Sequence, residues 1–254
     1  MVSQRRRLSA ASIGRLQQRF ETLDAAEMIG WAIQEFPRSR RAVVTSLQAE
    51  GVVIADMAME LDPSIRVITI DTGRLPEETL TYLETLRAHW DRPIEVVYPE
   101  PADLQPFVAS HGVNAFYASV DLRKQCCNLR KVLPLRRALG DVDCWLAGLR
   151  RSHSPARAAV PPVHLDTDNG GIVKLNPLIA WSAADVRAYM AERGLPMHPL
   201  YAQRYTSIGC APCTRAVEPG EDERAGRWWW EADTDKECGI NGVRQPLRIV
   251  EIAS

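Results

Sequence analysis

The sequence lacks a long hydrophobic run, a large net charge and a recognisable secretion signal. No apolar stretch in its 254 residues approaches the roughly 18 residues of a membrane span, so we expect no membrane partner. Its 31 Lys and Arg residues balance 32 Asp and Glu residues, which argues against a nucleic-acid partner bound through a uniform basic field. The basic amino-terminal segment contains no continuous apolar stretch, so it does not have the form of a signal peptide.

The six cysteines are Cys126, Cys127, Cys144, Cys210, Cys213 and Cys238. An even number is typical of disulfide-bonded secreted proteins, but those chains are short and carry a signal peptide. We therefore expect a reducing, cytoplasmic compartment, in which cysteines act as metal ligands or nucleophiles.

Basic residues concentrate in the middle of the chain. Between Arg123 and Arg157 there are nine Lys or Arg residues and only two Asp residues, a local excess of seven positive charges. This clustering predicts a site for a small polyanionic ligand.

Short apolar runs alternate with helical patterns along most of the chain. The runs that predict buried strands cover residues 42–47, 66–71, 94–99, 142–148 and 172–178. The patterns that predict helices cover residues 13–36, 49–61, 129–139 and 182–193, and a further helix begins at Pro76. The alternation predicts an α/β fold, in which a parallel sheet flanked by helices binds ligands at the carboxyl ends of its strands.

Two cysteine pairs have the spacing of metal ligands. Cys210 and Cys213 form a C-x-x-C motif, and Cys126 and Cys127 are adjacent. Two pairs suit a [4Fe–4S] cluster, whereas zinc and a redox-active dithiol are the alternatives. Cys144 lies within a predicted strand and is expected in the core.

Cys238 lies in a polar segment near the carboxyl terminus, away from the other cysteines. A thiol near a cationic ligand site suits a nucleophile, and an incidental surface thiol is the alternative.

Seven segments resemble motifs of one enzyme family, in the same order along the chain. They are IDTGRLPEET (70–79), CCNLRKV (126–132), GLRR (148–151), KLNPL (174–178), SIGCAPCTR (207–215), ERAGRWWWE (223–231) and KECG (236–239). Through these motifs the chain resembles the assimilatory sulfonucleotide reductases, specifically the iron–sulfur type that acts on adenosine 5′-phosphosulfate. The resemblance extends from about residue 43 to residue 241.

The resemblance implies a fold and a reaction. The fold would be an adenine nucleotide α-hydrolase-like sheet with three regions: an amino-terminal helical segment (1–40), a nucleotide- and cluster-binding core (41–215) and a carboxyl-terminal segment (216–254) that closes over the site. The four paired cysteines, Cys126, Cys127, Cys210 and Cys213, would hold a [4Fe–4S] cluster. Cys238 would attack the sulfur of adenosine 5′-phosphosulfate and expel AMP, and thioredoxin or a glutaredoxin-like dithiol would then release sulfite.

The resemblance also implies substrate-binding residues. Lys131, Arg224 and Arg227 correspond to family residues that contact the phosphosulfate, and these cations suit oxyanions. Arg150 and Arg151 begin an arginine-bearing loop beside the site that also contains Arg157. Ser46 begins a phosphate-type loop (46–50), although that loop has no G-x-G or Walker pattern. The other expected contacts are Asp71, Thr72, Gly73, Arg74 and Asn241.

Three positions depart from the family pattern. Asn241 replaces the histidine of the usual Glu-Cys-Gly-Leu-His ending, and an amide cannot carry a positive charge. We therefore expect activity with weaker substrate binding or a higher pKa of Cys238, unless an arginine such as Arg244 compensates. In the phosphate-type loop Gln48 replaces a small residue, and directly after the loop Gly51 replaces the usual acid.

Two other functions are also compatible with the sequence. A reductase of the 3′-phosphorylated nucleotide fits the same scaffold, although such enzymes generally lack the two cysteine pairs. A non-catalytic nucleotide- or cluster-binding regulator fits the altered ending, although the retained Cys238 favours catalysis. The sequence does not decide whether the chain forms a homo-oligomer.

Several conspicuous residues are expected to have structural roles. At least two of Trp228, Trp229 and Trp230 should anchor their segment on the core, and one of them could stack on an arginine. Lys174 and Asn176 should be structural, and His153 should lie in an exposed polar loop.

Overall fold

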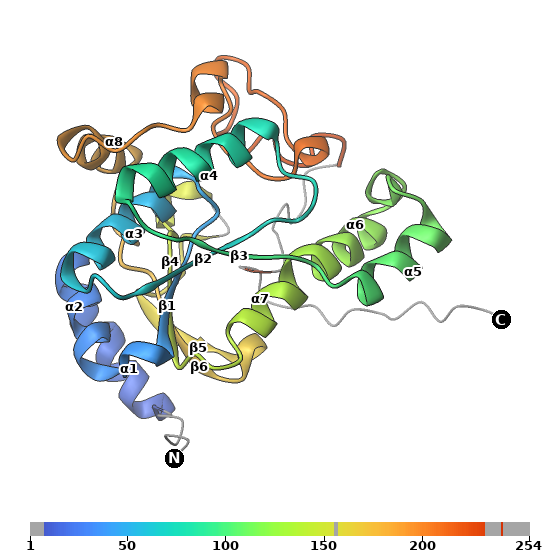
Figure 1. Cartoon of the computed structure of the whole chain (residues 1–254). Helices are drawn as coiled ribbons and strands as arrows, with labels where there is room; N and C mark the ends of the chain where they lie inside the picture. The colour runs from blue at the N-terminus through green and yellow to red at the C-terminus, as the bar shows by residue number, and fades with distance from the viewer. Residues whose placement is uncertain (1–7, 155–156, 232–239, 241–254) are drawn as a thin grey trace.

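Figure 1 shows the computed structural model, which describes residues 8–154, 157–231 and 240. Its centre is a six-stranded sheet with the order β3-β2-β1-β4-β6-β5. The strands are β1 (Arg41–Val44), β2 (Arg66–Ile70), β3 (Glu95–Val97), β4 (Cys144–Ala147), β5 (Val163–Asp166) and β6 (Ile172–Leu175). All neighbouring strands are parallel except β5, which pairs antiparallel with β6 at the edge. The predicted α/β fold class is confirmed, and the sheet is mixed rather than purely parallel.

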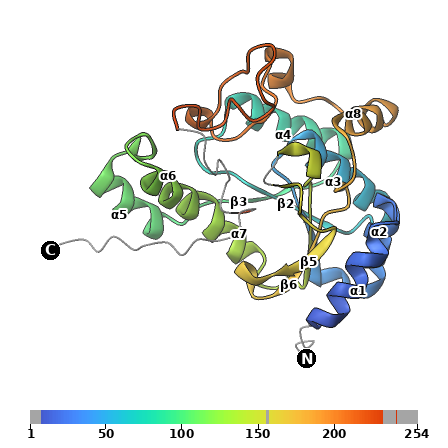
Figure 2. The same cartoon turned by 180° about the vertical axis from the view of Figure 1, so that it is seen from behind.

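Helices cover both faces of the sheet (Figures 1 and 2). They are α1 (Ala10–Phe20), α2 (Ala25–Glu35), α3 (Ala49–Leu61), α4 (Glu77–Trp90), α5 (Pro101–His111), α6 (Val120–Cys127), α7 (Leu133–Ala138) and α8 (Ala183–Glu192). Strand β1 shows why both faces need cover: Val43 packs with residues of α1, α2, α3, α4 and α8, whereas Ala42 packs with residues of α7. Both side chains are fully buried, as expected for a central parallel strand.

The predicted amino-terminal helix over residues 13–36 is wrong in one respect, because the structure contains two helices there. Asp24 begins α2 with a capping box: its carboxylate accepts a hydrogen bond from the Glu27 N–H (2.7 Å), and the Glu27 carboxylate accepts one from the Asp24 N–H (2.9 Å). This reciprocal cap favours a new helix start over continuation of α1.

The predicted helix over residues 129–139 begins earlier in the structure. Helix α6 is followed by one π-helical segment (Asn128–Val132) and then by α7. Together with α5, helix α6 projects to one side of the sheet (Figure 1). This projection carries Cys126 and Cys127 at its inner end.

Strand β5 was not predicted from the sequence. It alternates apolar and polar residues, Val163-His164-Leu165-Asp166, and follows two prolines, so it carries no buried apolar run. Among the described residues, no helix has both the length and the apolar composition that crossing a membrane requires.

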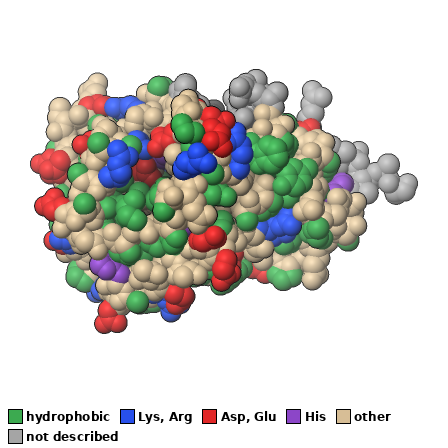
Figure 3. All heavy atoms as spheres, turned by 90° about the horizontal axis from the view of Figure 1, so that it is seen from above, with side chains coloured by type: hydrophobic (Ala, Val, Ile, Leu, Met, Phe, Trp, Pro, Cys, Tyr) green, Lys and Arg blue, Asp and Glu red, His purple; other side chains and the backbone are tan. Residues whose placement is uncertain are grey.

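The chain reverses its direction of travel across the sheet at β1. Strands β2 and β3 lie on one side of β1, whereas β4, β6 and β5 lie on the other. In open α/β sheets the crevice at the carboxyl ends of such strands is the usual ligand site. Figure 3 looks down on the molecule from above and shows basic and acidic side chains close together over the middle of this face.

Candidate active site

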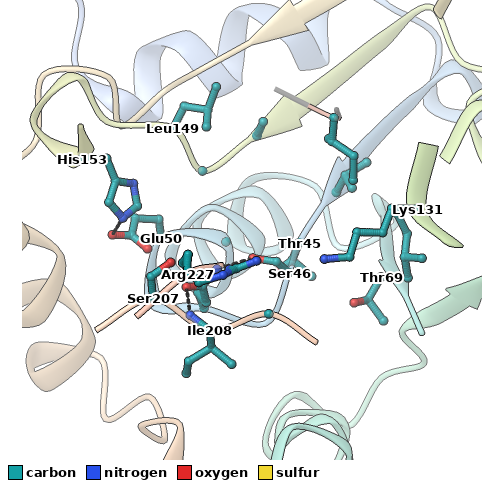
Figure 4. A pocket seen from close by; sticks show the side chains of 18 of the residues that line it. Thr45, Ser46, Glu50, Thr69, Lys131, Leu149, His153, Ser207, Ile208 and Arg227 are labelled. Atoms are coloured by element: carbon teal, nitrogen blue, oxygen red, sulfur yellow. Dashed lines mark hydrogen bonds and ion pairs between the residues drawn. The ribbon is translucent and has the colours of Figure 1, made fainter. Parts of the chain in front are cut away.

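A pocket of about 160 Å³ lies at the carboxyl ends of β1, β2 and β4 (Figure 4). Thr45 and Ser46 follow β1, Thr69 and Ile70 end β2, and Gly148 follows β4, and all five line the pocket. The pocket therefore occupies the position that the reversal at β1 predicts.

The turn from β1 into α3 forms the floor of this pocket. The Leu47 N–H donates to Thr45 Oγ1 (2.9 Å), and Leu47 has a positive φ of 60°. The turn is tight enough that a Cβ on Gly51 would lie 2.3 Å from Thr45 Oγ1, so only glycine fits there. The Gln48 side chain accepts a hydrogen bond from the Ile208 N–H (2.8 Å). Gly51 and Gln48 thus have packing roles, and the start of α3 faces the pocket, as in many anion sites.

Lys131, Arg224 and Arg227, the three cations expected to contact the phosphosulfate, all line this pocket. The Arg227 guanidinium is buried and stacks on Trp228, with 4.7 Å from its Cζ to the ring centroid. Arg224 Nη1 lies 3.5 Å from the Ser207 hydroxyl. Three cations in a half-enclosed pocket create a field that favours a polyanion.

In the arginine-bearing loop, Arg150 and Arg151 are both paired with carboxylates. Arg150 is fully buried and does not line the pocket; its Nε donates to Glu50 Oε1 (2.8 Å), and its Nη2 lies 3.5 Å from Glu223. Arg151 pairs at the surface with Glu21 (Nη1 to Oε2, 3.0 Å). Arg150 thus neutralises Glu50, Arg151 ties this loop to the end of α1, and contact of either residue with the substrate stays a prediction.

The prediction that His153 lies in an exposed loop is wrong. His153 is buried (7% exposed), lines the pocket and contacts Arg157, which also lines it. Burial lowers the pKa of His153 to about 4, and the nearby cations act in the same direction while Glu50 opposes them. A polar sequence context hid this burial, because neighbours of His153 such as Glu50 and Arg224 come from distant parts of the chain.

Of the four substrate contacts expected in the turn after β2, one lies at the pocket and the other three do not. Thr72 lines the pocket, whereas Asp71, Gly73 and Arg74 do not. Asp71 Oδ1 accepts a hydrogen bond from the Gly73 N–H (2.8 Å) and so shapes the turn. Arg74 donates to the Val113 carbonyl (2.6 Å) and lines a second cavity. Asp71, Gly73 and Arg74 thus build the turn and the second cavity, and their contact with the substrate stays a prediction.

This second, smaller cavity is lined by all four paired cysteines: Cys126, Cys127, Cys210 and Cys213. Its other walls include the cations Arg74, Arg123, Arg130 and Lys131. Lys131 lines both cavities and so stands between them. Burial raises the pKa of the Cys213 thiol to about 12, although nearby cations oppose this shift. Within the described ranges, no three His, Cys, Asp or Glu side chains are arranged as ligands of a single metal ion.

The Cys144 thiol is completely buried in β4, which confirms its expected place in the core. It does not line either of these two cavities.

The tryptophan segment is anchored as predicted. Trp228 is 1% exposed and lies under two arginine guanidinium groups, since Arg123 stacks on it at 4.6 Å as well as Arg227. Trp230 packs on Tyr117 (ring centroids 4.5 Å apart), whereas Trp229 is half exposed. Arg123 also binds the Glu231 carboxylate through two hydrogen bonds of 2.8 Å each.

Cys238 and Asn241 lie outside the described residues. Ile240 is described: it lines the pocket at the carboxyl ends of the strands, and its carbonyl lies 3.5 Å from Lys174 Nζ. Lys174 is buried and stacks on Trp145 at 4.3 Å. Asn176 is buried and donates to the Pro161 carbonyl (2.9 Å), so both residues have the structural roles expected of them.

Further residues line the pocket that the sequence did not single out. Thr45, Thr69 and Leu149 lie at or just beyond the carboxyl ends of strands, Trp145 lies within β4, and Ser207 begins the segment before the C-x-x-C motif. The carboxyl ends of the predicted strands are the signal that could have found the strand-end residues, but the order of the strands, which decides which ends form the pocket, is not visible in a single sequence.

Known proteins are similar to this chain in sequence and in fold. The sequence model of the phosphoadenosine phosphosulfate reductase domain family matches residues 40–216. An adenosine 5′-phosphosulfate reductase of Sinorhizobium fredii is 42% identical over 239 residues, which is 94% of each chain. A protein of the same name from Burkholderia cepacia is 46% identical over 197 residues, 78% of each chain.

Solved structures show the same fold. The phosphoadenylyl-sulfate reductase of Candida auris, solved as a phosphate complex, has a TM-score of 0.68 and 29% identity, and the match covers 83% of this chain and 98% of that one. The FMN adenylyltransferase of Candida glabrata has a TM-score of 0.54 at 11% identity (84% of this chain and 73% of that one), a likeness of fold alone.

Proposed function

Because the chain belongs to the phosphoadenosine phosphosulfate reductase family, we propose that it reduces adenosine 5′-phosphosulfate to sulfite and AMP in sulfate assimilation. The observation that carries this proposal is the position of Lys131, which lines both the cationic pocket and the four-cysteine cavity. A sulfonucleotide bound through its anionic end at Lys131 would lie next to that cavity.

The chain's own side chains supply the binding of the phosphosulfate. Lys131, Arg224 and Arg227 would donate to its oxygens, and the start of α3 would add the favourable end of the helix dipole. Because Arg227 is buried and stacked on Trp228, its guanidinium is held in place before the ligand arrives. Pre-ordered donors lower the free-energy cost of binding and of stabilising the transition state.

Cys238 would be the nucleophile. Its thiolate attacks the sulfate sulfur, an S–S bond forms, and the bond from sulfur to the phosphate oxygen breaks with release of AMP. A dithiol protein such as thioredoxin or a glutaredoxin then attacks Cys238 Sγ, sulfite leaves, and the dithiol becomes a disulfide, which supplies the two electrons. This requires a reducing compartment such as the cytoplasm. The position of Ile240 at the pocket supports the assignment, because only one residue separates it from Cys238 in the sequence.

The four-cysteine cavity suits a [4Fe–4S] cluster. Four thiols from two pairs can provide one ligand to each iron, and the surrounding Arg74, Arg123, Arg130 and Lys131 would offset the negative charge of a thiolate-bound cluster. When bound, such a cluster would supply an anionic, electron-delocalised centre behind Lys131. The cluster ligands would be Cys126, Cys127, Cys210 and Cys213.

Mass spectrometry tests the reaction. After incubation with adenosine 5′-phosphosulfate and without a reductant, we expect a sulfonate adduct on the peptide that contains Cys238. Cys238→Ser should give no adduct, whereas Cys144→Ala, the matched control for a buried thiol, should still give one. Unmodified Cys238 in wild-type protein that binds the nucleotide would refute the proposal.

Visible absorption of anaerobically purified protein tests the cluster. We expect absorption typical of iron–sulfur centres in the wild type and in Cys144→Ala, and its loss in Cys126→Ser and Cys210→Ser. Colourless wild-type protein that contains stoichiometric zinc would support the structural zinc alternative instead.

The 3′-phosphorylated nucleotide is a second candidate substrate, since the family's name and the Candida auris structure point to it. Comparing kcat/KM for the two sulfonucleotides decides between them. We expect the ratio to favour adenosine 5′-phosphosulfate, because the curated relatives with 41–46% identity carry that substrate in their names.

A further inference from the structure

The KLNPL segment (174–178) takes no part in the reaction described above, yet it places a charged side chain inside the protein. Lys174 lies in β6 and is only 3% exposed. Removing an ammonium group from water costs free energy, so a buried lysine requires partners for its charge and its N–H groups. The partners of Lys174 therefore indicate what this buried cation does.

The first partner of Lys174 is the Trp145 ring. The two residues are paired across β4 and β6, and Lys174 Nζ lies 4.3 Å from the ring centroid. The ring is itself fixed, because its Nε1 donates a hydrogen bond to Asp166 Oδ2 in β5 (3.0 Å). A cation over the face of an indole is attracted to it. The ammonium group is thus held against an immobilised ring that also lines the pocket.

The second partner of Lys174 is the backbone of Ile240. Lys174 Nζ donates to the Ile240 carbonyl at 3.5 Å, which is long for a hydrogen bond but close enough for attraction between a cation and a carbonyl dipole. The two residues are 66 positions apart in the chain. Lys174 therefore joins the central sheet to the part of the chain that contains Cys238.

The side chain of Ile240 makes a further contact that does not depend on charge. It packs against the apolar cluster that includes Ala42, Ile68 and Trp145, and it lines the pocket. Ile240 is thus held both by its carbonyl and by its side chain. Only one residue separates Ile240 from Cys238, and two residues of chain span at most about 7 Å. Whatever holds Ile240 therefore limits how far Cys238 can lie from the pocket.

We propose that Lys174 is a positioning residue, which fixes Ile240 at the pocket and thereby keeps the Cys238 thiol within reach of the sulfur that it attacks. This inference rests on the proposed function, because Cys238 is the nucleophile of that reaction. Lys174 does not line the pocket, so its effect concerns the attack by Cys238 more than the binding of the nucleotide. Holding a nucleophile close to its target raises its effective concentration.

The rate at which the sulfonate adduct forms on Cys238 tests the proposal. The full-length, cluster-loaded protein is mixed with adenosine 5′-phosphosulfate without a reductant and analysed by mass spectrometry over time. Lys174→Met keeps the unbranched stem but lacks the ammonium group, and we expect the rate to fall about tenfold. The Kd for AMP should change less than about threefold, because the nucleotide contacts remain. An unchanged adduct rate in folded Lys174→Met would overturn the proposal.

Lys124→Met is the matched control for the loss of a lysine, because Lys124 lines neither cavity. Its adduct rate should stay within about twofold of wild type. Urea unfolding of both methionine variants checks that each is folded. Wild-type protein that binds the nucleotide but forms no adduct would refute the proposed function, whereas an adduct that forms equally fast with and without Lys174 would refute only this inference.

Variants of Ile240 test the same contact without changing a charge. Ile240→Ala removes the apolar contact and should lower the adduct rate about fivefold, whereas Ile240→Leu keeps the bulk and should retain the rate within about threefold. In the Lys174→Met background, Ile240→Ala should lower the rate by less than a further twofold or so, about what is expected when both contacts hold one residue. Losses that multiply in the double variant would overturn the proposal.

Discussion

Replacing Gly209 with alanine should displace the Arg227 guanidinium while leaving the fold intact. Gly209 immediately precedes Cys210 and lines the pocket beside Arg227. An added Cβ would lie 2.3 Å from Arg227 Nη2 and 2.5 Å from its Cζ. Ordinary contacts begin at 3.4 Å, so the guanidinium has to retreat by about 1 Å.

The expected loss follows from this displacement. A misplacement of about 1 Å in a group that binds the reacting part of a substrate can reduce the rate about 100-fold. We therefore expect kcat/KM for adenosine 5′-phosphosulfate to fall between about 10-fold and 100-fold, or about 1.4 to 2.7 kcal/mol of transition-state stabilisation. Arg227 is stacked on Trp228, so the guanidinium cannot move without losing part of that contact as well.

The assay is steady-state kinetics with a saturating dithiol reductant, accompanied by urea unfolding. Gly30→Ala is the matched control, because no heavy atom lies within 4 Å of a Cβ at Gly30 in helix α2. Its kcat/KM should equal that of the wild type, and alanine in a helix should increase stability by about 0.5–1 kcal/mol. Wild-type kcat/KM for Gly209→Ala would show that the position of Arg227 does not matter for the reaction.

Other predictions concern stability and are measured by urea denaturation. Arg123→Met should lower the unfolding free energy by about 3–5 kcal/mol, because it leaves the Glu231 carboxylate buried without its cation, and adding Glu231→Leu should restore part of the loss. Equal losses in the single and double variants would contradict this. Trp228→Ala should cost about 3–5 kcal/mol and Trp229→Ala less than about 1 kcal/mol, because only Trp228 is fully buried. Burial lowers the pKa of His198 from 6.5 to about 4, so its contribution is complete above pH 6.5 and is lost as the pH falls toward 4. His198→Gln should therefore remove about 2 kcal/mol of the stability difference between pH 7 and pH 5, and an unchanged difference would refute this.

The parallel part of the fold could be predicted because its strands are buried on both faces. Residues 42–47 and 142–148 are apolar runs for this reason. Strand β4 lies within the second run, and all of β1 except its first residue, Arg41, lies within the first. Strand β5 has no such run, since it lies at the edge and alternates polar and apolar side chains. The break between α1 and α2 did have a local signal in the capping pair Asp24 and Glu27, but the apolar stripe that continues through it was stronger.

The site could be predicted only in part, because the type of a residue does not reveal which side chain or ligand it binds. Lys131, Arg224 and Arg227 line the expected pocket, whereas Arg150 and Arg151 bind carboxylates. Those carboxylates are 100 and 130 residues away in the chain, so nothing in the local sequence marks the pairing.

The π-helical segment from Asn128 to Val132 sets the direction of Lys131 relative to the cysteines that precede it in the same helical run. In an α-helix each residue advances the side-chain direction by about 100°, so the directions of Cys126, Cys127 and Lys131 would be fixed relative to one another. A π-turn carries one additional residue in the same turn and shifts that relation. Deleting one residue between Cys127 and Lys131 would restore α-helical phase and rotate the lysine relative to the cysteines. The π-turn therefore rotates Lys131 relative to the two cysteines. One continuous run of helix can then direct its thiols into the four-cysteine cavity and the Lys131 ammonium group toward both cavities.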